Sequence, residues 1–169
     1  MKNIVIQYYV EGEDEKQLIN VLKTQLKMIR PGKVQKLNVV DKEITDAMIR
    51  AYKDKTIVVL VFDTDTGNVD ILKRNIDKLK KCSSVVEVVT IPQVLNLEDE
   101  LIRSCDIHKI TELLDSRSIT DFKRDFIRIS NLGDKLIEHK FDINVFWNQS
   151  PKKPYQHVEN LSKKIKQKI

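Results

Sequence analysis

Acidic residues gather at two places in the sequence, each directly after an apolar stretch. The first is VEGEDE, Val10 to Glu15, where four carboxylates occur within five residues. The second is FDTDTGN, where Asp63 and Asp65 lie two residues apart and would share one face of an extended chain. Ionised carboxylates repel one another and resist burial, so packing alone requires neither group. Carboxylate oxygens are ligands that Mg²⁺ and Mn²⁺ prefer, and the two groups together would suit a divalent-metal site.

Helix capping is an alternative interpretation of the same acids. Glu13, Asp14 and Glu15 would occupy the first turn of a helix, where the helix dipole stabilises negative charge by about 0.3–1 kcal/mol. A single aspartate after a strand would equally serve as a cap or turn residue. Capping explains Glu13 and Asp14 well. For Glu15, helix capping and metal binding both remain open. Capping does not explain Glu11 together with the Asp-x-Asp pair.

The elements that must position these acids follow an alternating pattern. Runs of apolar and β-branched residues predict four strands, at residues 3–10, 34–40, 56–62 and 85–91. Apolar residues at helical spacing predict the intervening helices, at residues 13–29, 42–53 and 69–80. Such alternation predicts a parallel α/β sheet with right-handed crossovers, and ligands bind beyond the carboxyl ends of such strands. If the first and third strands are neighbours, Glu11, Asp63 and Asp65 converge at one rim.

The second half of the chain has a different, mainly helical character. The predicted helices there cover residues 97–105, 107–114, 119–129 and 130–139, and a last helix begins near Tyr155. The apolar run at residues 143–147 could add a fifth strand. We therefore expect an α/β core over residues 1–92 and a helical extension over residues 93–169, packed together as one compact domain.

The order and spacing of these features resemble the Toprim domain. This is the metal-binding catalytic module of type IA and type II topoisomerases, bacterial primases and OLD-family nucleases. The resemblance covers residues 1–92, with Glu11 and Gly12 matching the family's Glu-Gly motif and Asp63 and Asp65 its Asp-x-Asp motif. It implies a Toprim-like parallel sheet of about four strands flanked by helices. It also implies that Asp63 and Asp65 hold Mg²⁺ or Mn²⁺ and that Glu11 is a general acid/base or a further metal ligand.

The resemblance also suggests further site residues. Glu15 falls four positions after Glu11, where primases and OLD-type nucleases often carry an acid, and Glu98 or Asp99 could supply another acid after the fourth strand. A helix start with Asn96 as its cap is the alternative explanation for Glu98. OLD-type nucleases also use a late basic residue, for which Lys152 or Lys153 is the candidate.

Two functions remain open from the sequence. The first is a small, OLD-like Toprim nuclease, a Mg²⁺- or Mn²⁺-dependent hydrolase acting on DNA or RNA phosphodiesters. The second is a non-catalytic subunit of the same fold that binds metal and nucleic acid. A partner protein such as an ATPase would fit either, because the chain has no Gly-x-x-x-x-Gly-Lys-Ser/Thr sequence of its own.

Charge and hydropathy indicate the surroundings of the chain. From Pro151 onward six lysines and one glutamate account for +5, which equals the net charge of the whole sequence. A basic tail can bind nucleic acid, or it can be the solvated face of a terminal helix. No apolar run is long enough for a membrane span, and the first residues do not resemble a signal peptide. We therefore expect a cytoplasmic protein that does not enter a membrane.

Overall fold

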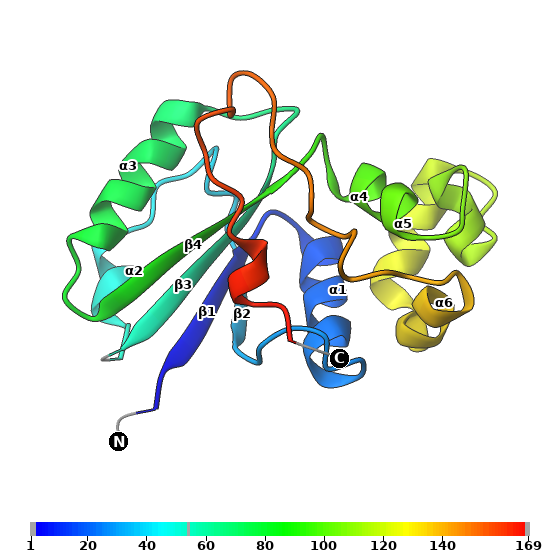
Figure 1. Cartoon of the computed structure of the whole chain (residues 1–169), viewed down its shortest axis with the longest axis horizontal. Coiled ribbons are helices and arrows are strands. Elements are labelled where there is room, and N and C mark those ends of the chain that lie inside the picture. Colours follow the sequence, from blue (N-terminus) through cyan, green and yellow to red (C-terminus); the bar gives the residue numbers. More distant parts are fainter. Residues whose placement is uncertain (1–2, 54, 168–169) are drawn as a thin grey trace.

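The computed structural model describes residues 3–53 and 55–167, and a parallel β-sheet forms its centre (Figure 1). The strands are β1 (Val5–Val10), β2 (Lys33–Lys36), β3 (Thr56–Asp63) and β4 (Val85–Gln93). Their spatial order is β2-β1-β3-β4, and every neighbouring pair is parallel. This arrangement confirms the predicted α/β class and is consistent with a Toprim-like sheet.

Helices cover both faces of the sheet and continue into the extension. The α-helices are α1 (Glu13–Thr24), α2 (Asp46–Arg50), α3 (Val69–Lys80), α4 (Leu97–Ser104), α5 (Ile119–Arg128) and α6 (Leu132–Glu138). Two short 3₁₀ helices are η1 (Ile110–Leu114) and η2 (Ser162–Lys164). Helix α1 packs against α5 and α6, whereas α2 and α3 lie on the other side of the sheet (Figure 1). The helices of the extension are therefore joined to the core through the α1 face, whereas Tyr155 and Val158 of the extension pack on the α3 face.

Strand β3 is the centre of the hydrophobic core. Its residues from Thr56 to Phe62 are all buried, as expected of a strand covered on both faces. Because side chains alternate along a strand, Val59 and Val61 join the core on the α1 face, whereas Val58 and Leu60 join the core on the α3 face. This double anchoring fixes the carboxyl end of β3, where Asp63 lies.

Several elements are shorter than the sequence predicts. Helix α1 ends at Thr24 rather than residue 29, because Lys27 has a left-handed backbone (φ 54°) and Met28 N–H bonds back to Leu22 C=O at 2.8 Å. The second strand covers residues 33–36 rather than 34–40, since Asn38 begins a turn and its side chain accepts from Val40 N–H at 3.2 Å. The helix expected over residues 42–53 covers only Asp46–Arg50.

The predicted fifth strand is wrong. Residues 143–147 form turns, and Trp147 has a left-handed backbone (φ 55°) that no strand accommodates. Ile143, Phe146 and Trp147 are instead buried in the core on the α1 face. A short apolar run is compatible with a buried turn as well as with a strand. The hydrophobic pattern of the sequence therefore could not distinguish the two.

The last predicted helix is also wrong. After Tyr155 the chain runs as an irregular segment whose helical part is limited to η2. Leu161 N–H bonds to Thr90 C=O of β4 at 2.8 Å, and Lys166 forms an isolated antiparallel bridge with Ile29. Main-chain bonds to the core thus replace the bonds of a helix, and the basic tail is not a helical face.

Across residues 3–53 and 55–167, none of the helices combines the length and the apolar character needed to cross a membrane.

Candidate functional site

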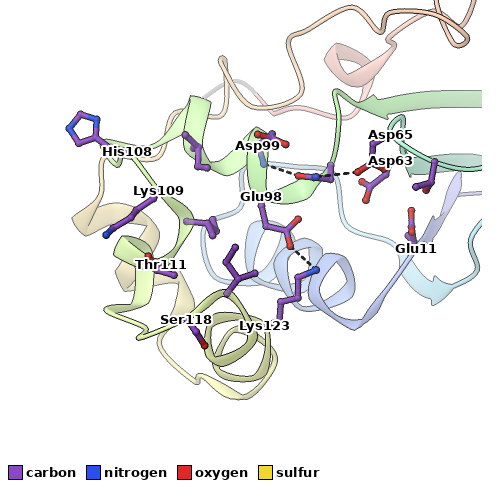
Figure 2. Close-up of a pocket in the computed structure, with 15 residues that line it drawn as sticks. Glu11, Asp63, Asp65, Glu98, Asp99, His108, Lys109, Thr111, Ser118 and Lys123 are labelled. Carbon is purple, nitrogen blue, oxygen red and sulfur yellow. Dashed lines mark hydrogen bonds and ion pairs between the residues drawn. The ribbon is translucent and has the colours of Figure 1, made fainter.

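The acids from both motifs meet at one rim of the sheet. Strands β1 and β3 pair directly, with Tyr9 opposite Leu60, so the residues that follow each strand lie side by side. Glu11, Asp63, Asp65 and Glu98 all line one cavity of about 740 Å³ between this rim and the extension. Figure 2 shows Glu11, Asp63 and Asp65 together on one side of that cavity. We call these four residues the acidic end of the cavity.

Glu11 follows β1 and is half-buried at the acidic end. Its Oε2 atom is buried and has no hydrogen-bond partner among the described residues. Burial raises the pKa of Glu11, a backbone hydrogen bond from Asp63 opposes the shift, and the charge of Asp65 adds to it. An oxygen without a partner in such a place is costly unless a proton or a cation satisfies it.

Asp63, the last residue of β3, is held in position by a buried hydrogen-bond chain. Gln93 Nε2 donates to Asp63 Oδ1 at 2.6 Å, and Trp147 Nε1 donates to Gln93 Oε1 at 3.1 Å. Because the indole N–H can only donate, it fixes which way the Gln93 amide points. The backbone N–H of Trp147 bonds in turn to buried Glu100 at 3.0 Å. Burial, with the charge of Glu11 next, raises the pKa of Asp63 to about 8.

Glu15 takes the capping role that the sequence left open. Its Oε2 accepts from the N–H of Gly12 at 2.8 Å and so closes the start of α1. The side chain is also buried beside the acidic end. Burial, a hydrogen bond with Asp14 and the charges of Asp14 and Asp63 raise its pKa to about 9. Glu15 therefore caps the helix and contributes to the crowding of carboxyl groups, but it does not line the cavity.

Asp65 lies in a tight turn between β3 and α3. Asn68 caps α3, and Gly67 supplies the positive φ (89°) that the turn needs. A Cβ at Gly67 would come within 2.3 Å of Val40, so only glycine fits. The hydroxyl of Tyr155 donates to Thr66 C=O at 2.8 Å and ties the turn to the C-terminal segment.

Glu98 reaches the cavity from the first turn of α4. Asn96 caps this helix by accepting from Asp99 N–H at 3.0 Å, so the helix-start interpretation is confirmed for Asn96. Asn96 also donates to Asp65 at 3.3 Å. The carboxylate of Glu98 forms an ion pair with Lys123 of α5 at 3.0 Å, drawn as a dashed line in Figure 2.

Lys123 is the site residue that sequence reasoning missed. It lines the cavity beside Glu98, while Lys152 and Lys153 are exposed in the loop before Tyr155 and do not belong to the lining. The hydrogen bond to Glu98, together with its charge, raises the pKa of Lys123. No local signal distinguishes Lys123 from other lysines, because its approach to Glu98 depends on how α4 and α5 pack.

The acidic end has the ligand chemistry of a hard divalent cation. Its side chains offer oxygen atoms only, and one of them, Glu11 Oε2, is buried without a hydrogen-bond partner in the part of the chain that the structure describes. Within residues 3–53 and 55–167, no three His, Cys, Asp or Glu side chains are grouped tightly enough to form a preassembled metal site. The residues therefore fit a divalent metal by the type of their ligand atoms, whereas their side chains are not drawn together into one tight group among the described residues.

Comparison of the chain with protein-family models, curated proteins and solved structures finds no match.

Proposed function

We propose that this protein is a divalent-metal-dependent phosphodiesterase acting on nucleic acid, a small nuclease of the Toprim type that works in the cytoplasm. The observation that carries the proposal is the convergence of Glu11 and Asp63 at neighbouring strand ends, with Asp65 and Glu98 around the same cavity. Packing does not account for this convergence. Burying Glu11 and Asp63 next to each other raises the pKa of both carboxyl groups, which means that their ionised forms are destabilised there.

Each residue has a distinct task in this proposal. Asp63 and Asp65 would hold Mg²⁺ or Mn²⁺, with Glu98 as a further ligand. When bound, the ion polarises the phosphate and stabilises its developing negative charge. Glu11 would act as general acid/base, a role that suits a carboxyl group whose pKa is raised by burial. Gln93 keeps Asp63 oriented through its 2.6 Å hydrogen bond.

The basic group of the site is Lys123 in this proposal, in place of Lys152 or Lys153. Lys123 lines the cavity, and its ion pair with Glu98 places its ammonium group beside the acidic end. There it can contact a non-bridging phosphate oxygen. Lys152 and Lys153 lie on the C-terminal segment and remain candidates for binding nucleic acid further from the reaction.

Cleavage assays with matched variants test the function directly. Labelled supercoiled DNA, single-stranded DNA and structured RNA would be incubated with Mg²⁺, Mn²⁺ or EDTA. Glu11→Gln and Asp63→Asn should each reduce metal-dependent cleavage at least about 100-fold, as loss of general acid/base or metal-ion catalysis does. Asp77→Asn, an exposed aspartate of α3, is the matched control. Metal-dependent cleavage that survives both site variants would contradict the proposal.

A second candidate is a non-catalytic module that binds metal and nucleic acid, alone or beside a partner such as an ATPase. The observation that favours it is the ion pair between Glu98 and Lys123, which occupies a carboxylate that the nuclease would use as a metal ligand. Calorimetry separates the two candidates. Metal binding at the acidic end without cleavage of any substrate would support the binding module.

A further inference from the structure

The cavity has a second half whose chemistry differs from the acidic end. Residues 108–111, 118, 119 and 123, from η1 and α5 and the chain around them, line it on the side of the extension. We call these residues the extension wall. Figure 2 shows His108, Lys109, Thr111 and Ser118 on the side of the cavity away from Glu11 and Asp63.

The charge of the extension wall is opposite to that of the acidic end. It carries Lys109 and Lys123 and no carboxylate among its lining residues. Thr111 and Ser118 add hydroxyl groups. Ser118 Oγ accepts from Asp121 N–H at 3.1 Å, which leaves its own hydrogen available to donate. Such a wall suits an anionic ligand.

The extension wall also exposes apolar surface. Ile119, the first residue of α5, is 59% exposed, and Ile102 and Ile110 line the same cavity. Ile119 contributes little to the core, whereas Phe122 and Phe126 of the same helix are buried. Aliphatic side chains next to lysines can bury their apolar surface against the face of an unpaired base, whatever the base is.

We propose that the cavity binds single-stranded nucleic acid, with one phosphate at the acidic end and the adjoining nucleotide against the extension wall. This inference rests on the proposed function, which supplies the phosphodiester. Ile119 contacts the base, and Lys109 binds the next phosphate. A cavity of about 740 Å³ is of the size of small-ligand sites and holds on the order of one or two nucleotides. In a duplex the base faces are covered by stacking, so only an unpaired base can lie against Ile119.

A binding measurement tests this assignment without depending on catalysis. Fluorescence anisotropy would compare a short labelled single strand, as DNA and as RNA, with a hairpin duplex of the same sequence. Ca²⁺ replaces Mg²⁺ to prevent cleavage. The single strand should bind at least about tenfold tighter than the duplex. Lys109→Ala should weaken its binding and lower the slope of log affinity against log salt by about one.

Matched variants make the result specific to the extension wall. Ile119→Ala should weaken binding of the single strand about five- to tenfold, because it removes most of the apolar surface that the base would cover. Ile127→Ala, an exposed isoleucine of the same helix outside the cavity, and Lys80→Ala, an exposed lysine of α3, should not weaken it. Equal affinity for the duplex, unchanged binding by both wall variants, or no binding to either nucleic acid would overturn the assignment.

The outcome separates this inference from the proposed function. Expected binding together with no Mg²⁺-dependent cleavage would refute the nuclease and leave the single-strand site standing. Cleavage that Asp63→Asn abolishes but that occurs equally on duplex and is insensitive to Lys109→Ala would support the nuclease and refute the single-strand site.

Discussion

At the scale of single residues, the site and its immediate surroundings contain carboxyl groups whose pKa is raised by burial. Burial raises the pKa of Asp63 to about 8 and that of Glu15 to about 9. Between the ordinary carboxyl pKa of about 4 and these raised values, the folded protein binds more protons than the unfolded chain. The free energy of unfolding of the metal-free protein therefore falls as pH rises through this window.

Asp63→Asn should remove part of that pH dependence. We expect the variant to raise Tm in EDTA by about 3–6 °C at pH 8 and to leave it nearly unchanged at pH 4, where the aspartic acid is itself neutral. Thermal melts at the two pH values check this. Asp77→Asn on exposed α3 should change Tm little at either pH. An equal shift of Asp63→Asn at both values would show that burial of its charge is not the cause.

Mg²⁺ should stabilise the protein in a manner that depends on Asp63 and on pH. The ion binds the ionised carboxylates, so at ten times its Kd it should add about 1.4 kcal/mol, or roughly 3–5 °C in Tm, at pH 8. The effect should shrink at pH 6, because protons then compete for the same oxygens. Asp63→Asn should abolish it. A Tm that does not respond to Mg²⁺ or Mn²⁺ at pH 8 would count against both metal-based functions.

At the scale of elements, the strands and their carboxyl ends were predictable, because β1, β3 and β4 are long and rich in β-branched residues. Glu11, Asp63 and Asp65 could be brought together on that basis alone, since parallel strands end at one rim. The buried chain from Gln93 through Trp147 to Glu100 could not be predicted. It depends on a turn around Trp147 that has no periodic signal.

Gln93→Leu tests how much the hydrogen bond from Gln93 of β4 contributes to stability and to the orientation of Asp63. The variant leaves Trp147 Nε1 without its partner and frees the Asp63 side chain. We expect a loss of about 2–4 kcal/mol in the free energy of unfolding, measured in urea, and weaker metal binding by calorimetry. Gln149→Leu, at an exposed position, should change neither. Unchanged metal affinity in Gln93→Leu would mean that Asp63 binds metal without the hydrogen bond from Gln93.

Tyr155→Phe tests the link between the C-terminal segment and the turn that holds Asp65. Loss of the bond to Thr66 C=O should cost about 1 kcal/mol and also weaken metal binding. The matched control is Tyr52→Phe, which removes a 2.7 Å hydroxyl–hydroxyl bond to Tyr9. The control should lose similar stability but keep its metal affinity. Equal metal affinity in the two variants would show that the turn containing Asp65 keeps its conformation without the hydrogen bond from Tyr155.

At the scale of the whole molecule, the cavity exists because the helical extension faces the rim of the sheet. Within the extension, Lys123 joins α5 to Glu98 of α4 at 3.0 Å. The contact could not be predicted, because it depends on how the two helices pack, and the two residues are 25 positions apart in sequence. The resulting cavity has carboxylates at the rim of the sheet and on α4, and lysines on the side of η1 and α5.

Lys123→Ala should therefore act on two ligands in opposite directions. Removing its positive charge and freeing Glu98 should strengthen Mg²⁺ binding several-fold. The same change should weaken nucleic-acid binding several-fold, because one cation of the extension wall is lost. Lys123→Arg should leave both nearly as in the natural protein. Parallel changes in the two affinities would contradict the proposed division of the cavity.

The C-terminal segment has a consequence for the time at which the site is completed. Tyr155 holds the turn beside Asp65, and the residues after it bond to Thr90 of β4 and to Met28 near the end of α1. A ribosome finishes the sheet, with Glu11 and Asp63 already in place, well before it releases this segment. A nascent chain that has emerged only as far as α6 therefore carries the acids but lacks Tyr155. Its hydrogen bond to Thr66 C=O, which holds the turn that contains Asp65, has not yet formed. The acidic end therefore reaches its final form only after the residues that follow α6 have been synthesised and have packed against the sheet.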